Sequence, residues 1–198
     1  MLFKNIVLVV CSAILAIGCA STKELKPMTS AIESTTVGQK GFSLSIPEQK
    51  EWIITEENPY KIVLSKQSNK NNERYTIQAL VVKLPSFKND EDFLNFIEKS
   101  MNKNRDKSKL KIIEQHVDFA SGQAEKCVRY NSKEEPKIKS KKTKSLVLGM
   151  VNFTCRHPDK ENTGVYIAYS KKSYSENTDE NLVAQAENIF SGLTFSAF

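Results

Sequence analysis

The chain contains few of the residues and patterns that enzymes use for chemistry. Among its 198 residues there are two histidines and one tryptophan. It has no Gly-x-Ser-x-Gly, His-Glu-x-x-His, P-loop or dinucleotide-binding pattern. We therefore expect no catalytic site, no metal and no cofactor, and we find no internal repeat. An enzyme whose catalytic groups meet only in the folded chain remains the least favoured interpretation.

Long apolar runs are also missing, except at the N-terminus. After Lys4, residues 6–17 form an apolar run of 12 residues. Such a run is too short to cross a hydrocarbon core of ~30 Å as a helix, but it suits the centre of a signal peptide. Ending at Gly18-Cys19, the segment resembles a bacterial lipoprotein signal, which implies cleavage before Cys19 and lipid on that cysteine. An ordinary secretory signal cleaved near Ala20 and an uncleaved N-terminus are the alternatives.

This resemblance implies a cell-envelope protein whose first partner is the membrane, reached through the N-terminal lipid. Ala20 rather than aspartate after the cysteine is typical of the outer membrane, facing the periplasm, rather than of the inner membrane. Residues 1–18 are then the signal peptide. Residues 19–40, rich in Ser, Thr and Lys, are predicted to be the lipidated cysteine and a flexible tether. Residues 41–198 are predicted to form a single domain.

Cysteine is scarce in the remaining chain. With Cys11 in the signal and Cys19 lipidated, Cys127 and Cys155 are left. In an oxidising compartment two such cysteines favour a disulfide. In the chain-entropy model, closing this loop stabilises the folded state by about 3.5 kcal/mol. Two independent buried thiols are the alternative. A zinc site that adds His157 is disfavoured because its spacing matches no common zinc pattern.

The two cysteines also predict a hairpin. If Cys127 pairs with Cys155, the tip falls at residue 141, within a lysine-rich segment. The same pairing places Arg129 on the face of Cys127 and the apolar Phe153 on the face of Cys155, which we expect to require a bulge or an edge position. The lysines of the tip are Lys137, Lys139, Lys141, Lys142 and Lys144.

These lysines are a candidate contact for anionic lipid, an anionic polymer or an acidic envelope protein. A solvated loop tip that only keeps the hairpin soluble is the alternative. Nucleic acid is not expected as a partner, despite a pI of about 9.0, because the chain is expected outside the cytoplasm.

Hydrophobic periodicity predicts an α+β fold with a mainly antiparallel sheet and two amphipathic helices packed on it. One helix follows Asn89 as N-cap, and the other begins with Thr178 as cap and ends at Gly192. The longest strand, 74–84, is apolar on both faces toward its end and is expected to be central. Residues 56–59 are expected to be a turn-rich link. Strands are predicted at residues 42–46, 52–55, 61–66, 74–84, 110–119, 124–130, 146–156 and 164–170.

The order of these elements resembles the PsbP-like α/β/α sandwich family. The likeness is carried by Gly41-Phe42-Ser43-Leu44-Ser45-Ile46-Pro47 with Trp52, by Asp92-Phe93-Leu94, by residues 164–170 and by residues 186–193. The resemblance implies a binding or assembly factor without catalytic residues.

One strand carries a further candidate site. Glu114, His116 and Asp118 share a face of this strand, and together they could bind a metal or titrate as a unit. The alternative is a polar strand face that is only solvated. We expect the solvated face. Trp52 and Tyr60 are expected in the core and at its rim.

Taken together, these features favour a lipid-anchored, non-enzymatic envelope protein that binds or supports another envelope component. A domain that binds a small ligand or envelope polymer, in a pocket between sheet and helices, is the alternative.

Overall fold

The computed structural model describes residues 36–47, 51–68, 73–105, 108–121, 126–137, 146–174 and 181–198. The described elements, in chain order, are β1 (Thr36–Gln39), β2 (Phe42–Ser45), β3 (Ile53–Asn58), β4 (Lys61–Ser68), β5 (Glu73–Lys83), α2 (Asp90–Asn104), β6 (Leu110–Phe119), β7 (Cys127–Pro136), β8 (Val147–Arg156), β9 (Thr163–Ser173), α3 (Leu182–Ser191) and β10 (Leu193–Phe195). None of the described helices is long and apolar enough to cross a membrane.

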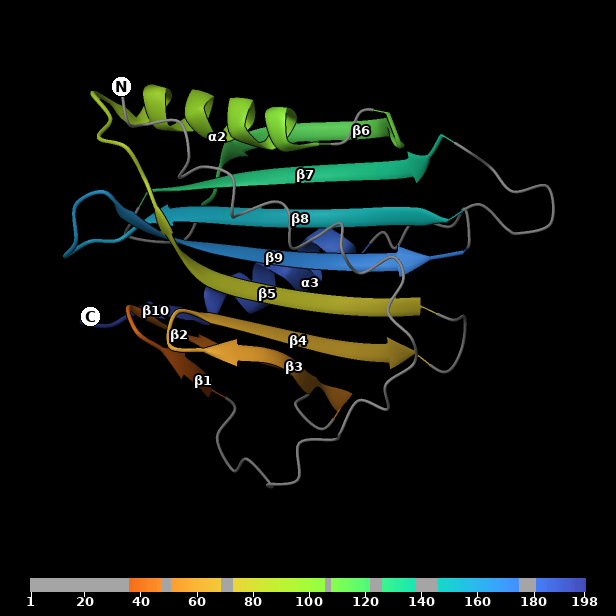
Figure 1. The fold of residues 1–198 in the computed structure, drawn as a ribbon, viewed down its shortest axis with the longest axis horizontal. Helices are drawn as coiled ribbons and strands as arrows, with labels where there is room; N and C mark the ends of the chain where they lie inside the picture. The colour runs from red at the N-terminus through yellow and green to blue at the C-terminus, as the bar shows by residue number, and fades with distance from the viewer. Residues whose placement is uncertain are drawn as a thin grey trace.

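The strands form two antiparallel sheets. The large sheet has the order β3-β4-β5-β9-β8-β7-β6, and the small one has the order β1-β2-β10. All neighbouring strands in both sheets are antiparallel. β5 lies between β4 and β9, so the prediction of a central strand is confirmed (Figure 1). The α+β class with a mainly antiparallel sheet is confirmed as well.

Helix α3 and the small sheet cover one face of the large sheet. α3 packs on β8, β9 and β2 and buries Ala186, Ile189 and Phe190 (Figure 1). The ring of Phe190 stacks on Phe153 of β8, with centroids 4.0 Å apart. Trp52 is buried in the same apolar cluster, as expected, whereas Tyr60 is 48% exposed.

Gly192 ends α3 because its backbone lies against β2. Its φ of −84° is open to any residue, so positive φ is not what requires glycine here. A Cβ at this position would lie 2.8 Å from Cβ and 3.0 Å from the carbonyl oxygen of Ser45. The amide of Ser45 donates to the carbonyl of Gly192 at 3.0 Å. The predicted stop is thus confirmed, and its cause is a close approach between two backbones.

Helix α2 covers the end of the opposite face, where it packs on β6 and β7. As predicted, Asn89 caps it: its Oδ1 accepts from the amide of Asp92 at 2.8 Å. Asp90 in the first turn accepts from Arg156 of β8 at 2.6 Å and also pairs with Lys126. The bond from Lys126, with a smaller contribution from Arg156, lowers the pKa of Asp90 against its partial desolvation. These contacts fix the start of the helix to the sheet.

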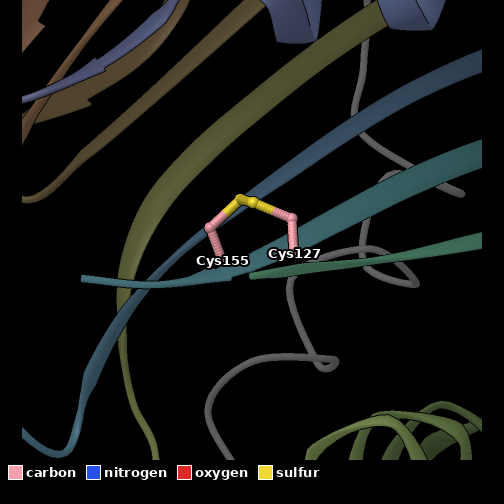
Figure 2. The surroundings of a disulfide bond; sticks show 2 residues. All are labelled: Cys127 and Cys155. Atoms are coloured by element: carbon pink, nitrogen blue, oxygen red, sulfur yellow. A yellow bond between two sulfur atoms is a disulfide. The ribbon is translucent and has the colours of Figure 1, made fainter. Parts of the chain in front are cut away.

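The predicted hairpin and its disulfide are both present. Cys127 and Cys155 face each other in the β7–β8 register and are bonded, with their Cα atoms 4.1 Å apart (Figure 2). The expected bulge or edge position is wrong, because β7 lies between β6 and β8 and its register with β8 is continuous. Arg129 is accommodated on the core face by ion pairs, as described below.

Several boundaries differ from the prediction. Thr36–Gln39, expected in the tether, forms a strand paired with β2, so the folded part begins before Gly41. β3 continues to Asn58, through most of the expected link at 56–59. β7 continues to Pro136 because its polar residues pair with both β6 and β8. The predicted start of the second helix at a Thr178 cap is wrong, because α3 begins at Leu182 with Asn181 as its N-cap and without a side-chain cap bond. The signal, Cys19, Thr178 itself and the lysines at 139–144 lie outside the described residues.

Candidate functional site

The face of the large sheet that α3 does not cover contains a pocket of about 410 Å³. Its position follows from strand alternation: Thr76 and Gln78 of β5 line it, whereas Ile77 between them belongs to the cluster under α3. The same holds on β9, where Ala168 and Ser170 line the pocket and Tyr169 faces α3. We call this hollow the sheet pocket. Its size lies in the range of ~300–1,000 Å³ common for small-molecule sites.

The sheet pocket has an apolar side. The hydrophobic residues there come mainly from β8 and from the neighbouring ends of β6 and β7. They are Val63, Leu110, Pro136, Leu146, Leu148, Met150 and Ala168. Met150 and Ala168 are buried, and Leu148 is half-buried. An apolar group of a ligand would gain by displacing water from this side.

The opposite side of the pocket is polar. Ser65, Thr76 and Ser170 stand next to one another across β4, β5 and β9, because the register pairs Ser65 with Thr76 and Thr76 with Ser170. Two residues along β5 and β9, on the same face, Arg74 is the register partner of Lys172. Hydroxyl and cationic donors are thus concentrated on β4, β5 and β9.

The acidic residues of the pocket are already paired. Glu56 accepts from Lys61 at 2.7 Å. Glu134 pairs with Arg105 at the end of α2, also at 2.7 Å, and both side chains are about 95% buried, with exposures of 4% and 5%. Arg74 and Lys172 have no carboxylate partner in the described part of the chain, and Arg74 has a single long bond to Ser65 Oγ, at 3.4 Å. Within the part of the chain that the structure describes, the pocket therefore presents two positive charges without a carboxylate partner.

Arg105 fixes the wall of the pocket that Glu134 belongs to. Besides Glu134, it donates to Gln115 Oε1 at 2.9 Å and to the hydroxyl of Tyr130 at 2.5 Å. Burial raises the pKa of Tyr130, and the nearby Arg105 charge only partly offsets this, so the phenol stays a neutral acceptor. These bonds join α2 to β6 and β7 beside the pocket.

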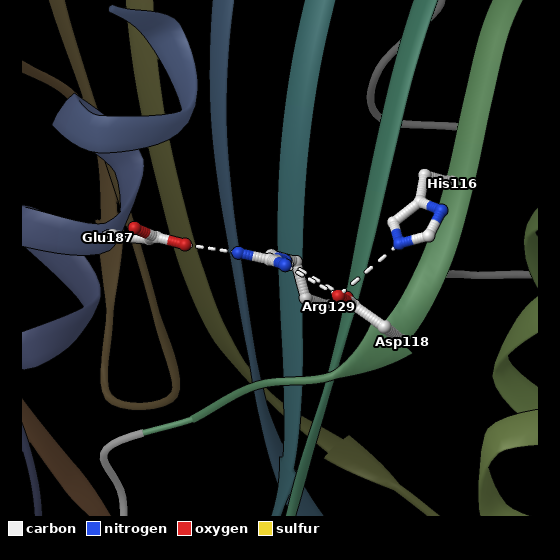
Figure 3. A network of polar contacts seen from close by, with 4 residues as sticks. All are labelled: His116, Asp118, Arg129 and Glu187. Atoms are coloured by element: carbon white, nitrogen blue, oxygen red, sulfur yellow. Dashed lines mark hydrogen bonds and ion pairs between the residues drawn. The ribbon is translucent and has the colours of Figure 1, made fainter.

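The predicted triplet Glu114, His116 and Asp118 does not form a metal site. His116 Nε2 lies 3.4 Å from Asp118 Oδ2, and His116 is 63% exposed (Figure 3). Asp118 accepts two bonds from Arg129, at 2.9 and 2.5 Å, and Arg129 also pairs with Glu187 of α3 (Figure 3). Within the described residues there is no group of three or more His, Cys, Asp or Glu able to hold a metal.

This network explains how a charged residue is tolerated beside Phe153. Burial acts to raise the pKa of Asp118, but the bidentate bond from Arg129, helped by His116, outweighs it and holds the pKa below its usual range. The bond from Asp118 in turn raises the pKa of Arg129. The arrangement ties β6, β7 and α3 together and is structural.

His157 is also structural. It is 5% exposed, and its Nε2 lies 3.1 Å from the carbonyl oxygens of both Gly41 and Ser196. Its Nδ1 accepts from the amide of Asp159 at 3.2 Å. Both ring nitrogens are therefore occupied by backbone groups, and Cys155 is in the disulfide, which is incompatible with the zinc alternative.

Of the lysines predicted at the hairpin tip, Lys137 is described, and it is exposed. The chain enters the segment from Pro136 and returns at Leu146, and both of these residues line the sheet pocket. The predicted basic segment is thus connected at both ends to the pocket's apolar side.

Sequence reasoning missed the residues of the sheet pocket. A usable signal was present: Arg74, Thr76 and Gln78 form a polar stripe on one face of a strand that was expected to be central. Such a stripe needs partners, solvent or a ligand. Its neighbours, Ser170 and Lys172, become visible only once β9 is known to pair with β5.

No family model and no curated protein matches this chain. Solved structures with a similar chain path include the Ran-binding protein Mog1p of Saccharomyces cerevisiae, at 9% identity and a TM-score of 0.47, covering 79% of this chain and 91% of that one. The PsbP protein of Synechocystis sp. PCC 6803 matches at 11% identity and a TM-score of 0.45, covering 84% and 96%. A PsbP protein is thus among the neighbours, as the sequence resemblance suggested. These TM-scores lie below 0.5, so the fold description rests on the strands of this chain.

Proposed function

We propose that this chain is a non-enzymatic binding domain of the bacterial cell envelope, which holds a ligand in the sheet pocket. The pocket is the observation that carries the proposal, because it combines an apolar side with two cations, Arg74 and Lys172, that have no acidic partner among the described residues. This favours the ligand-binding interpretation over the support of an envelope protein, which the sequence ranked first.

The proposal includes lipid attachment at Cys19, at the outer membrane and facing the periplasm. The signal-like residues 1–18 and the disulfide between Cys127 and Cys155 support it, since disulfides persist in oxidising compartments. Labelling cells with radioactive palmitate tests the attachment. The wild-type chain should incorporate label and the Cys19→Ser variant should not, and equal labelling would refute lipid attachment at this residue.

Ligand binding is tested by filling the pocket. Ser170 is half-buried and lies between Thr76 of the polar side and Met150 of the apolar side, so Ser170→Trp would occupy the space, whereas Ser170→Thr adds little volume and is the matched control. Both variants of the chain from Ala20, which retains every described strand and helix, are purified without detergent from envelope extract and analysed by native mass spectrometry.

Wild type and Ser170→Thr should carry an additional mass that Ser170→Trp lacks, while all three melt as folded proteins. The same bound mass on all three, or none on any after incubation with extract, would overturn the proposed function.

A further inference from the structure

We infer that the ligand of the sheet pocket is an acyl chain that ends in an anionic group, with the anion held between Arg74 and Lys172. This inference rests on the proposed function and adds the chemical class of the ligand. Its first basis is the position of the two cations. Arg74 and Lys172 are directly opposite each other on β5 and β9 and line the same pocket.

Two like charges in directly opposed positions of neighbouring strands repel each other and weaken the pairing. On the other face of the same two strands, the cation Lys171 lies opposite the neutral Tyr75, and a carboxylate partner is provided: Lys171 pairs with Glu73 at 3.0 Å, and Glu73 also accepts from Tyr75 at 2.9 Å. Arg74 and Lys172 have no such carboxylate among the described residues. An anion bound between them would supply it.

The surrounding groups suit an anion rather than a neutral polar ligand. Thr76 and Ser170 provide hydroxyl donors on the same two strands, two residues along from the cations and on the same face. The carboxylates of the pocket do not compete, because Glu56 and Glu134 are held by Lys61 and Arg105. Charge-assisted bonds from a guanidinium and an ammonium are the strong ones available to carboxylate or phosphate oxygens.

The rest of the pocket selects a ligand with an apolar tail. From Lys172, the next position across the sheet is Leu148, which is its register partner on β8, and Met150 lies beside it on the same face. Leu146 and Pro136 continue the apolar side toward β7. A free phosphate or acetate would leave these residues in contact with water, whereas an acyl chain would cover them.

The test separates head group from tail. The chain from Ala20 is titrated by calorimetry with four probes below their aggregation limits: decanoate, decyl phosphate, the neutral decanol and the tail-less acetate. Decanoate and decyl phosphate distinguish a fatty acid from a phosphate-bearing lipid as the source of the anion. Wild type should bind one or both of them at least about tenfold more tightly than decanol, and acetate should not bind measurably.

Charge variants locate the head group. Arg74→Gln and Lys172→Gln should each weaken binding of the anionic probe about tenfold, and the double variant about a hundredfold, with decanol unchanged. Arg74→Lys keeps the charge and should retain most of the affinity. Lys83→Gln is the matched control, because Lys83 is exposed at the other end of β5 and outside the pocket. It should bind as wild type does.

Equal affinity of wild type for the anionic probes and decanol, or no effect of the two charge variants, would overturn the inference. If Ser170→Trp still abolished binding in that case, the proposed function would stand with a neutral apolar ligand. If the charge variants reduced only the sedimentation of the protein with phosphatidylglycerol vesicles, and not decanoate or decyl phosphate binding, the cations would contact a membrane surface and the inference would also be wrong.

Discussion

The disulfide between Cys127 and Cys155 gives the sharpest stability prediction. The two residues are separated by 28 positions, and both are buried, at 1% and 0% exposure. A loop of that length removes about 3.5 kcal/mol of chain entropy from the unfolded state. Reduction should therefore lower the free energy of unfolding by about that amount without removing any atom from the core.

Equilibrium urea unfolding of the chain from Ala20, with and without reductant, measures this loss. That chain contains no cysteines besides Cys127 and Cys155, so the effect of reductant has one source. For a urea slope of about 1–3 kcal/mol per M, a loss of about 3.5 kcal/mol should lower the midpoint by about 1.2–3.5 M. The variant with both cysteines replaced by alanine is the control, and its midpoint should not respond to reductant.

A midpoint shift below about 0.3 M in the wild type would refute the reasoning, since it corresponds to less than about 1 kcal/mol. Alkylation of the unfolded but unreduced protein provides a second check. A mass increase would show that the thiols are free and would refute the disulfide between Cys127 and Cys155.

Three further predictions follow from single contacts. Arg129→Met should lower the free energy of unfolding by about 1 kcal/mol at pH 7, because Asp118 and Glu187 lose their cation at a partly exposed site. Because Arg129 holds the pKa of Asp118 low, the stabilisation from this pair is complete above the ordinary carboxyl pKa of about 3.9 and is lost as the pH falls through the lower pKa of the folded state. Urea unfolding at pH 3 and below should therefore show a smaller difference in unfolding free energy between wild type and Arg129→Met than at pH 7. A difference that does not change with pH would contradict the pairing. Gly192→Ala should lower the free energy of unfolding by about 1–3 kcal/mol, because the added Cβ would contact Ser45. Gly38→Ala is the control and should lower it by less than about 1 kcal/mol, because the nearest atom is 3.9 Å from the added Cβ. Equal shifts of the melting temperature would refute the close-approach argument. Asn89→Ala should lower the free energy of unfolding by about 1 kcal/mol, because α2 loses its N-cap, and Asn89→Ser should retain most of the wild-type stability. If both variants melt at the wild-type temperature, the cap does not contribute to stability.

The elements that the sequence predicted well are those whose signals are local. Alternation identified most of the strands, and the polar cap with an apolar stripe identified α2. The cysteines added one long-range fact, because two residues that must bond also fix the register of β7 with β8. That register was predictable to the residue.

The elements that were missed depend on pairing between distant segments. β1 has one large apolar residue, Val37, and becomes a strand because β2 is beside it, with β10 on the far side of β2. Arg129 looked incompatible with the hairpin because its partners, Asp118 and Glu187, belong to β6 and α3. The sheet pocket needs the order β5-β9-β8, which no local pattern specifies.

The most direct test of the central claim is to map where an anionic amphiphile contacts the protein. Methyl-labelled chain from Ala20 is titrated with decanoate or decyl phosphate, whichever binds more tightly, and followed by NMR. The account predicts shifts confined to methyl groups of the sheet pocket, such as those of Val63, Leu148 and Met150, with none at Leu64 and Val151, which lie on the opposite face under α3 and the small sheet. Shifts centred on that opposite face, or no shifts at saturating probe, would contradict it.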